Sequence, residues 1–164
     1  MKPSSSNPGT IDFFFCGKSE DTKIHQGLID RLSNLDDQFF PTPWNSQKWN
    51  EVLKHKSGSY LIGVCHDVER VYGFALFGTS NPDSAHLYKI LVDPELKRQG
   101  LGRTLLLDAM SLLKEKKHKS VFLEVEQSNF EALGFYRNLG YKVLVGKKDF
   151  YGPMRDAFAM EAIL

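Results

Sequence analysis

The chain has 164 residues, which is the length of one domain and enough to bury a core without disulfides or a structural metal. Its 21 basic and 20 acidic residues leave a formal charge of +1, so no overall field favours nucleic acid, although a local basic patch stays open. No apolar run approaches the roughly 18 residues of a membrane span. Cys16 and Cys65 make no disulfide framework and are expected to be reduced, although they could pair. We therefore expect a cytoplasmic protein without a membrane partner.

The first ten residues, MKPSSSNPGT, are polar and interrupted by proline and glycine. They predict a flexible tail at 1–10, followed by a single domain at 11–164. A strand is expected at 11–16, and apolar residues at helical spacing predict an amphipathic helix at 21–35. Prolines 41 and 43 then end any helix, and Asn45 or Ser46 can cap a second short one.

The middle of the chain is rich in β-branched and aromatic residues. The segments YLIGVCH, VYGFALFG and HLYKILV predict three neighbouring antiparallel strands. Beyond the Asp93-Pro94 pair the pattern alternates between helix and strand, with segments expected at 103–116, 121–125, 130–139, 141–145 and 157–163. This order predicts an α/β fold with a mixed, largely antiparallel, twisted sheet flanked by helices.

The most distinctive motif is the turn KRQGLG, residues 97–102, between a strand and a helix. The amides around Arg98 to Thr104 lack partners within the helix, and Gly100 and Gly102 allow a phosphate to approach the backbone. An ordinary strand-to-helix turn is the alternative. Leu105 stands where the third glycine of a dinucleotide fingerprint belongs, which argues against nicotinamide binding. The segment from Gly140 to Lys148 fails the Walker spacing.

Two motifs together resemble the GCN5-related N-acetyltransferases (GNAT). The first is KRQGLG after a strand ending ILVDP, which resembles the acetyl-CoA pyrophosphate loop of that family. The second is LEVEQSNFEALGFYRNLGY, whose Asn129, Ala132 and Tyr136 keep the family's Asn-x-x-Ala-x-x-x-Tyr spacing. Together with Pro43-Trp44, this segment is most similar to bacterial ribosomal-protein alanine N-acetyltransferases. Lys97 departs from the arginine or glutamine that is usual at its position.

The resemblance implies a GNAT fold, acetyl-CoA as cosubstrate and a set of site residues. Glu124 would be the catalytic base and Tyr136 the proton donor to the leaving thiolate. Residues expected to contact acetyl-CoA are Ile90, Leu91, Val92, Lys97, Arg98, Gln99, Gly100, Leu101, Gly102, Arg103, Thr104, Asn129 and Tyr136. Taken alone, Glu124 could be an exposed strand carboxylate, Tyr136 a packing residue and Asn129 a helix cap.

The resemblance also suggests the acceptor, a protein N-terminal α-amine and specifically the N-terminal alanine of a small-subunit ribosomal protein. A lysine side chain, a small-molecule amine and a non-catalytic acetyl-CoA-binding module are the alternatives. The five histidines show no ligand spacing, so we expect no metal site. The basic run at 114–119 is interpreted as a solvated helix end, with docking on RNA as the minor alternative, so we expect no direct nucleic-acid binding. We expect a monomer or a weak dimer.

Overall fold

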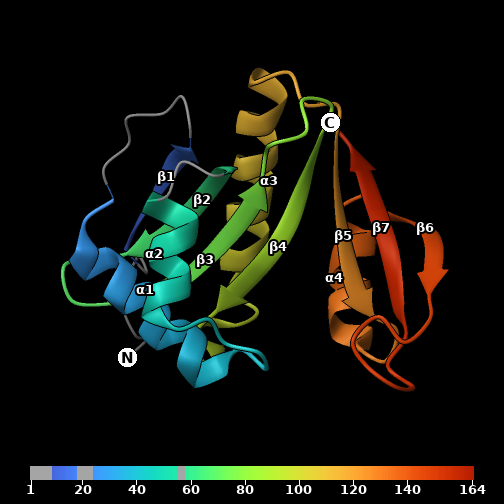
Figure 1. Ribbon diagram of the computed structural model, residues 1–164, viewed down its shortest axis with the longest axis horizontal. Helices are drawn as coiled ribbons and strands as arrows, with labels where there is room; N and C mark the ends of the chain where they lie inside the picture. Colours follow the sequence, from blue (N-terminus) through green and yellow to red (C-terminus); the bar gives the residue numbers. More distant parts are fainter. Residues whose placement is uncertain (1–8, 18–23, 55–57) are drawn as a thin grey trace, which may run out of the picture.

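In the computed structural model, which describes residues 9–17, 24–54 and 58–164, seven strands form one sheet in the order β1-β2-β3-β4-β5-β7-β6 (Figure 1). The strands are β1 (Thr10–Gly17), β2 (Ser59–His66), β3 (Val71–Gly78), β4 (Ser84–Val92), β5 (Ser120–Glu126), β6 (Lys142–Lys147) and β7 (Ala157–Ile163). The helices are α1 (Gln26–Phe39), α2 (Ser46–Lys54), α3 (Leu101–Glu115) and α4 (Phe130–Asn138), with a short 3-10 turn, η1 (Pro94–Leu96).

The sheet is mixed, with one parallel contact. Strands β1 to β4 pair with their neighbours in antiparallel fashion, and so do β5, β7 and β6. Only β4 and β5 run parallel, as expected for two strands joined by a crossover helix, here α3. The predicted α/β fold and its three consecutive antiparallel strands are confirmed.

The contact between β4 and β5 is short. It consists of three residue pairs, from Ser84 with Ser120 to His86 with Phe122, while β4 continues to pair with β3 as far as Val92. Beyond the last shared pair the two strands diverge, as Figure 1 shows. Along Ile90 to Val92, one backbone edge of β4 is therefore not paired with β5.

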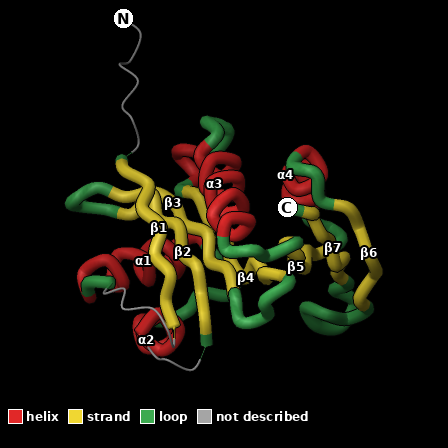
Figure 2. Tube along the Cα trace, turned by 90° about the horizontal axis from the view of Figure 1, so that it is seen from above, coloured by secondary structure: helices red, strands yellow, loops and turns green. Residues whose placement is uncertain are grey.

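Helices cover both faces of the sheet (Figure 2). One core lies between the sheet and α3 with α4, and it includes Leu105, Leu123 and Leu133. The other lies between β1 to β4 and the pair α1 and α2, with Trp49 and Phe74 at its centre. No helix in the described ranges is long and apolar enough to cross a membrane.

Several predicted boundaries were wrong, among them the start of the first helix, which is Gln26, and the end of the strand predicted at 141–145, which is Lys147. The first helix ends at Phe39 rather than at residue 35, because its last turn carries Asp36 into the core before Pro41 stops the helix. Helix α3 begins at Leu101 rather than at 103, because the left-handed Gly100, at φ 86°, ends the turn and starts the helix. Residues 21–23 of the predicted first helix and most of the predicted tail fall outside the described residues.

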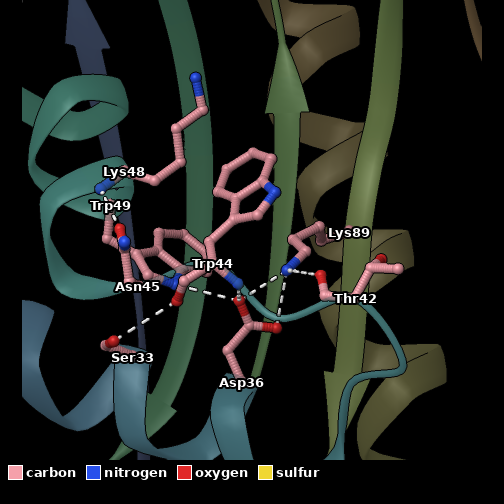
Figure 3. A network of polar contacts seen from close by, with 8 residues as sticks. All are labelled: Ser33, Asp36, Thr42, Trp44, Asn45, Lys48, Trp49 and Lys89. Atoms are coloured by element: carbon pink, nitrogen blue, oxygen red, sulfur yellow. Dashed lines mark hydrogen bonds and ion pairs between the residues drawn. The ribbon is translucent and has the colours of Figure 1, made fainter.

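A buried ion pair joins the first helix to the middle of the sheet (Figure 3). The Lys89 ammonium on β4 lies 2.7 Å from Asp36 Oδ1, and both side chains are almost fully buried. Asp36 Oδ2 also accepts hydrogen bonds from the Trp44 amide and the Trp49 indole. The rings of Phe40 and Trp44 lie 4.1 Å and 4.7 Å from the ammonium. The pair thus holds the loop between α1 and α2 against β4.

We predict that Asp36→Ala destabilises the fold by about 3–5 kcal/mol, because it leaves the Lys89 charge buried without a carboxylate. The change is measured as the free energy of unfolding in urea, with Asp37→Ala as the control because Asp37 is exposed on the same helix turn. The double variant Asp36→Leu, Lys89→Met removes both charges and should recover part of the loss. Equal stability of Asp36→Ala and Asp37→Ala would contradict the role given to the pair.

Candidate active site

The turn between β4 and α3 leads into a helix N-terminus that could hold an anion. Asp93 begins it by accepting a hydrogen bond from the Glu95 amide, and Arg98 and Gly100 both adopt left-handed backbone angles, φ 64° and 86°. Helix α3 then starts at Leu101, so the first amides of the helix point out of its N-terminus. Unpaired amides and the positive end of the helix dipole favour a phosphate at this position.

Thr104 corrects one part of the predicted set. Its amide donates to the Gly100 carbonyl at 2.9 Å, and its hydroxyl donates to the same carbonyl at 3.2 Å. The amide of Thr104 therefore belongs to the helix, and the expectation that it lacks an internal partner was wrong. The amides of Leu101, Gly102 and Arg103 precede the first helical hydrogen bond and remain candidates for a phosphate.

Gly102 lies where the turn approaches α4. A Cβ atom there would stand 3.5 Å from Val92 Cγ2 and 3.7 Å from the Phe135 ring, which are ordinary contacts. Nearby, the Lys97 ammonium is 3.9 Å from the Glu131 carboxylate, an exposed pair that spans the same gap. The turn, the end of β4 and the start of α4 therefore surround one region, in which Ile90, Leu91 and Val92 are each partly buried.

Glu124 lies on β5, two residues beyond the last pair with β4. Side chains alternate along β5, since Leu123 and Val125 are buried in the α3 core and Glu124 points to the other face. Its Oε2 lies 2.7 Å from His86 Nε2, and its Oε1 accepts a hydrogen bond from the Lys147 ammonium. Its side chain is only 8% exposed, so it is not the solvated carboxylate that was the alternative.

The environment keeps Glu124 ionised. Burial acts to raise the pKa of Glu124, but the hydrogen bond from Lys147 and the charge and hydrogen bond of His86 outweigh it and leave the pKa below its ordinary value. Both carboxylate oxygens are engaged by donors. The group is thus a fixed negative charge at the point where the two strands separate.

Tyr136 and Asn129 lie on the other side of the same region, on α4. Tyr136 is 8% exposed, and burial raises its pKa, so the phenol keeps its proton at neutral pH. Asn129 caps α4 by accepting from the Ala132 amide at 3.1 Å, which confirms the capping alternative and leaves its amide nitrogen for another partner. Tyr151 links the two sides, because its hydroxyl donates to the Glu124 carbonyl at 2.9 Å and its position also raises the pKa of Tyr136.

Sequence analysis missed three side chains at this site. His86 stacks on Phe122 with ring centroids 4.2 Å apart and contacts Glu124. Lys147 comes from β6, and Tyr151 from the loop that follows it. His86 could have been noticed in the sequence, because it is a titratable residue in the strand that leads to the glycine turn and lies two residues before the aromatic Tyr88. No local signal marks Lys147 or Tyr151, because β6 and its loop reach Glu124 through the sheet.

Comparison with known proteins identifies the family. Residues 29–141 match the model of the acetyltransferase (GNAT) family. The chain belongs to that family. It is 36% identical over 131 residues to the [ribosomal protein bS18]-alanine N-acetyltransferase of Salmonella typhimurium, covering 75% of this chain and 88% of that protein. The protein of the same name from Haemophilus ducreyi is 27% identical over 136 residues, with 83% and 90% covered.

The fold is that of the family as well. The crystal structure of the ribosomal-protein-S18-alanine N-acetyltransferase from Escherichia coli superposes with a TM-score of 0.76, at 22% identity and 94% coverage of both chains. The suspected GNAT membership and the GNAT fold are therefore confirmed, and the chain is an acetyltransferase by family. Within the described residues, no group of histidine, cysteine and carboxylate side chains has the arrangement of a metal site.

We predict that Gly102→Ala weakens acetyl-CoA binding by about tenfold or more, equivalent to ~1.4 kcal/mol, because a methyl group would stand where the phosphate approaches the backbone. The protein itself should stay folded, since the added Cβ meets its neighbours at ordinary distances. The measurements are calorimetric affinity and thermal midpoint.

Gly27→Ala is the matched control for this change. Gly27 is likewise the second residue of its helix, and a Cβ there would meet no atom within 4 Å. Unchanged affinity is expected for that variant. Equal affinity of the Gly102 and Gly27 variants would show that the phosphate binds elsewhere.

Proposed function

We propose that this enzyme transfers the acetyl group of acetyl-CoA to the α-amine of a protein N-terminus, with the N-terminal alanine of ribosomal protein bS18 as the acceptor. The buried, ionised carboxylate of Glu124 beside the last residue pair of β4 and β5 carries the proposal, and the buried phenol of Tyr136, which Tyr151 links to the Glu124 backbone, supports it. The names of the relatives supply the acceptor. We further propose a cytoplasmic location and a monomer or weak dimer.

The residues of the turn fit acetyl-CoA. The first amides of α3 would hold the pyrophosphate, and the backbone of Ile90 to Val92 would hold the extended arm, because β5 no longer pairs with that stretch of β4. The side-chain oxygen of Asn129 caps α4, and its amide nitrogen would donate a hydrogen bond to acetyl-CoA. Backbone groups would supply most of this binding, so we expect Lys97 to be tolerated in place of the usual arginine or glutamine.

Two side chains would move the protons. The attacking amine must be neutral, so its proton is removed toward Glu124, whose charge lies on the face where β4 and β5 separate. When the carbon–sulfur bond breaks, Tyr136 Oη gives its proton to the departing sulfur. Burial raises the pKa of Tyr136 and so keeps the phenol protonated at neutral pH, which means that a proton is present to be given to the sulfur as the carbon–sulfur bond breaks.

The chemistry of the acceptor favours an α-amine over lysine. An α-amine, with an ordinary pKa of about 7.7–8.0, is roughly one tenth neutral at pH 7, whereas lysine, near 10.4, is neutral in less than about one part in a thousand. A carboxylate that already holds two donors is a weak base. It therefore suits an α-amine, whose ordinary pKa is closer to neutral pH than that of a lysine side chain.

Mass spectrometry of acceptor peptides tests the acceptor. A peptide with the amino terminus of bS18 and alanine first should gain one acetyl group on the α-amine, faster than peptides beginning with serine or methionine. The same peptide with a blocked terminus and an internal lysine should gain none. Acetylation of only the blocked peptide would establish a lysine acetyltransferase. With acetyl-CoA binding intact, no gain on any peptide would favour a small-molecule amine or a non-catalytic module.

Substitution tests the two proton carriers. Glu124→Gln and Tyr136→Phe should each lower kcat by about 10²-fold or more, since general acid–base groups contribute 10²–10⁴ to rates. Affinity for acetyl-CoA should change little in Glu124→Gln. Tyr141→Phe is the matched control, because Tyr141 is also a buried tyrosine, with its ring 5.6 Å from that of Tyr136. A Tyr136→Phe enzyme as active as Tyr141→Phe would refute the donor role.

A further inference from the structure

We propose that the imidazole of His86, rather than the Glu124 carboxylate itself, takes the proton directly from the acceptor amine, and that Glu124 acts through this ring by orienting it and balancing its charge. The proposal deepens the proposed function and rests on it. It adds a residue that no family motif in this sequence marks. Four observations support it, namely the hydrogen bond between the two groups, their order of exposure, the stacking of the ring and the engagement of both carboxylate oxygens.

The hydrogen bond fixes the ring tautomer. A carboxylate only accepts hydrogen bonds, so the ring nitrogen facing Glu124 Oε2 at 2.7 Å carries a hydrogen. In the neutral ring the proton is then on Nε2, and Nδ1 has a free lone pair. A buried carboxylate that holds one nitrogen of an imidazole makes the other nitrogen a better proton acceptor, because the negative charge stabilises the imidazolium that forms.

The ring of His86 is more exposed to solvent than the carboxylate of Glu124. The side chain of His86 is 24% exposed and that of Glu124 only 8%. The Lys147 ammonium occupies the second carboxylate oxygen and is itself 38% exposed. An amine that arrives from solvent therefore meets His86 and Lys147 before it can reach Glu124. Of these two, the Lys147 ammonium has no lone pair, whereas the neutral imidazole has one and so can accept a proton.

Packing holds the ring at the point where the strands separate. His86 and Phe122 form the last residue pair shared by β4 and β5, and their rings stack at 14°. On the other side the Tyr88 ring lies 4.3 Å from His86. Burial raises the pKa of Tyr88, so the phenol of this neighbour stays uncharged at neutral pH. The groups that act on His86 electrostatically are thus Glu124 from β5 and, through it, Lys147 from β6.

The proton balance of the step is simple. A nitrogen–hydrogen bond of the acceptor ammonium breaks, its electron pair stays on the amine, and the proton forms a bond to His86 Nδ1. Glu124 remains ionised and pairs with the imidazolium through Nε2. The imidazolium passes this first proton to solvent as the neutral amine attacks the thioester carbon, and the imidazole then takes the second proton that the nitrogen loses as the amide forms. Tyr136, which has given its proton to the departing sulfur, regains one from solvent, so that each turnover releases one proton in all.

His86→Gln separates this role from a purely structural one. Glutamine can donate to Glu124 from nearly the same place as Nε2, but it has no basic nitrogen. We expect kcat/KM for the acceptor peptide to fall by about 10²-fold, which is within the range for a general base. The affinity for acetyl-CoA should stay unchanged. The dependence of kcat/KM on pH between about 5 and 8, where histidines change charge, should flatten.

His66→Gln is the matched control. His66 Nε2 also lies 2.9 Å from a carboxylate, that of Asp12, but on the β1–β2 ladder at the far side of the sheet. That variant should keep the wild-type rate and pH profile. A His86→Gln enzyme that keeps more than half of the wild-type rate with an unchanged profile would overturn the proposal. Such a result would leave the acetyltransferase function intact.

Nitrogen-15 NMR of the histidine rings tests the proposal without an acceptor. At pH 8 the ring of His86 should show a protonated Nε2 and an unprotonated Nδ1, and Glu124→Gln should shift the Nε2 resonance, because the hydrogen bond from Nε2 to a carboxylate oxygen is lost. A ring protonated on Nδ1, or one insensitive to Glu124→Gln, would overturn the proposal. If wild type acetylates no peptide, the proposed function fails, and the NMR result still decides whether His86 and Glu124 form the expected pair.

Discussion

Strands β4 and β5 stop pairing after His86 and Phe122, and the candidate groups lie at or beyond that point. Backbone groups inside a protein need hydrogen-bond partners, so an edge that faces the interior without a neighbouring strand favours an extended ligand. The helix that joins the two strands starts beside the same edge and directs its first amides toward it. A binding place for a phosphate-bearing, chain-like cosubstrate thus follows from one interrupted ladder.

A bulge in β4 determines which of its side chains lie on each face of the sheet. The register shift between Leu76 and Phe77 places one extra residue, Tyr88, between Leu87 and Lys89. Leu87 packs in the α3 core, and strict alternation would send Lys89 there too. The bulge turns Lys89 to the opposite face instead, where Asp36 receives it. It also leaves Tyr88 beside His86, so the ion pair and the acceptor side of the site depend on the same irregularity.

Local patterns predicted much of the fold. Alternation in β5 gave the direction of Glu124, and the left-handed Gly100 lies in the turn that the glycines marked. Long-range effects explain most of what was missed. The extra turn of α1 exists because Asp36 meets a lysine 53 residues away, and no pattern within the helix shows that partner. Lys89 stands out in the sequence as the one lysine inside the apolar segment HLYKILV. Its direction could not be predicted, because it depends on the bulge in β4.

The site also spans the weakest seam of the sheet. Three residue pairs join β4 to β5, whereas the ladders on either side of them are longer. Glu124 hydrogen-bonds across this seam to His86 and, within its own half of the sheet, to Lys147. A small rotation of one half against the other would therefore lengthen the contact between His86 and Glu124, while the turn before α3, built within the first half, would keep its shape. The contact between His86 and Glu124 thus depends on how the two halves of the sheet meet at this seam, whereas the backbone angles of the glycine turn do not.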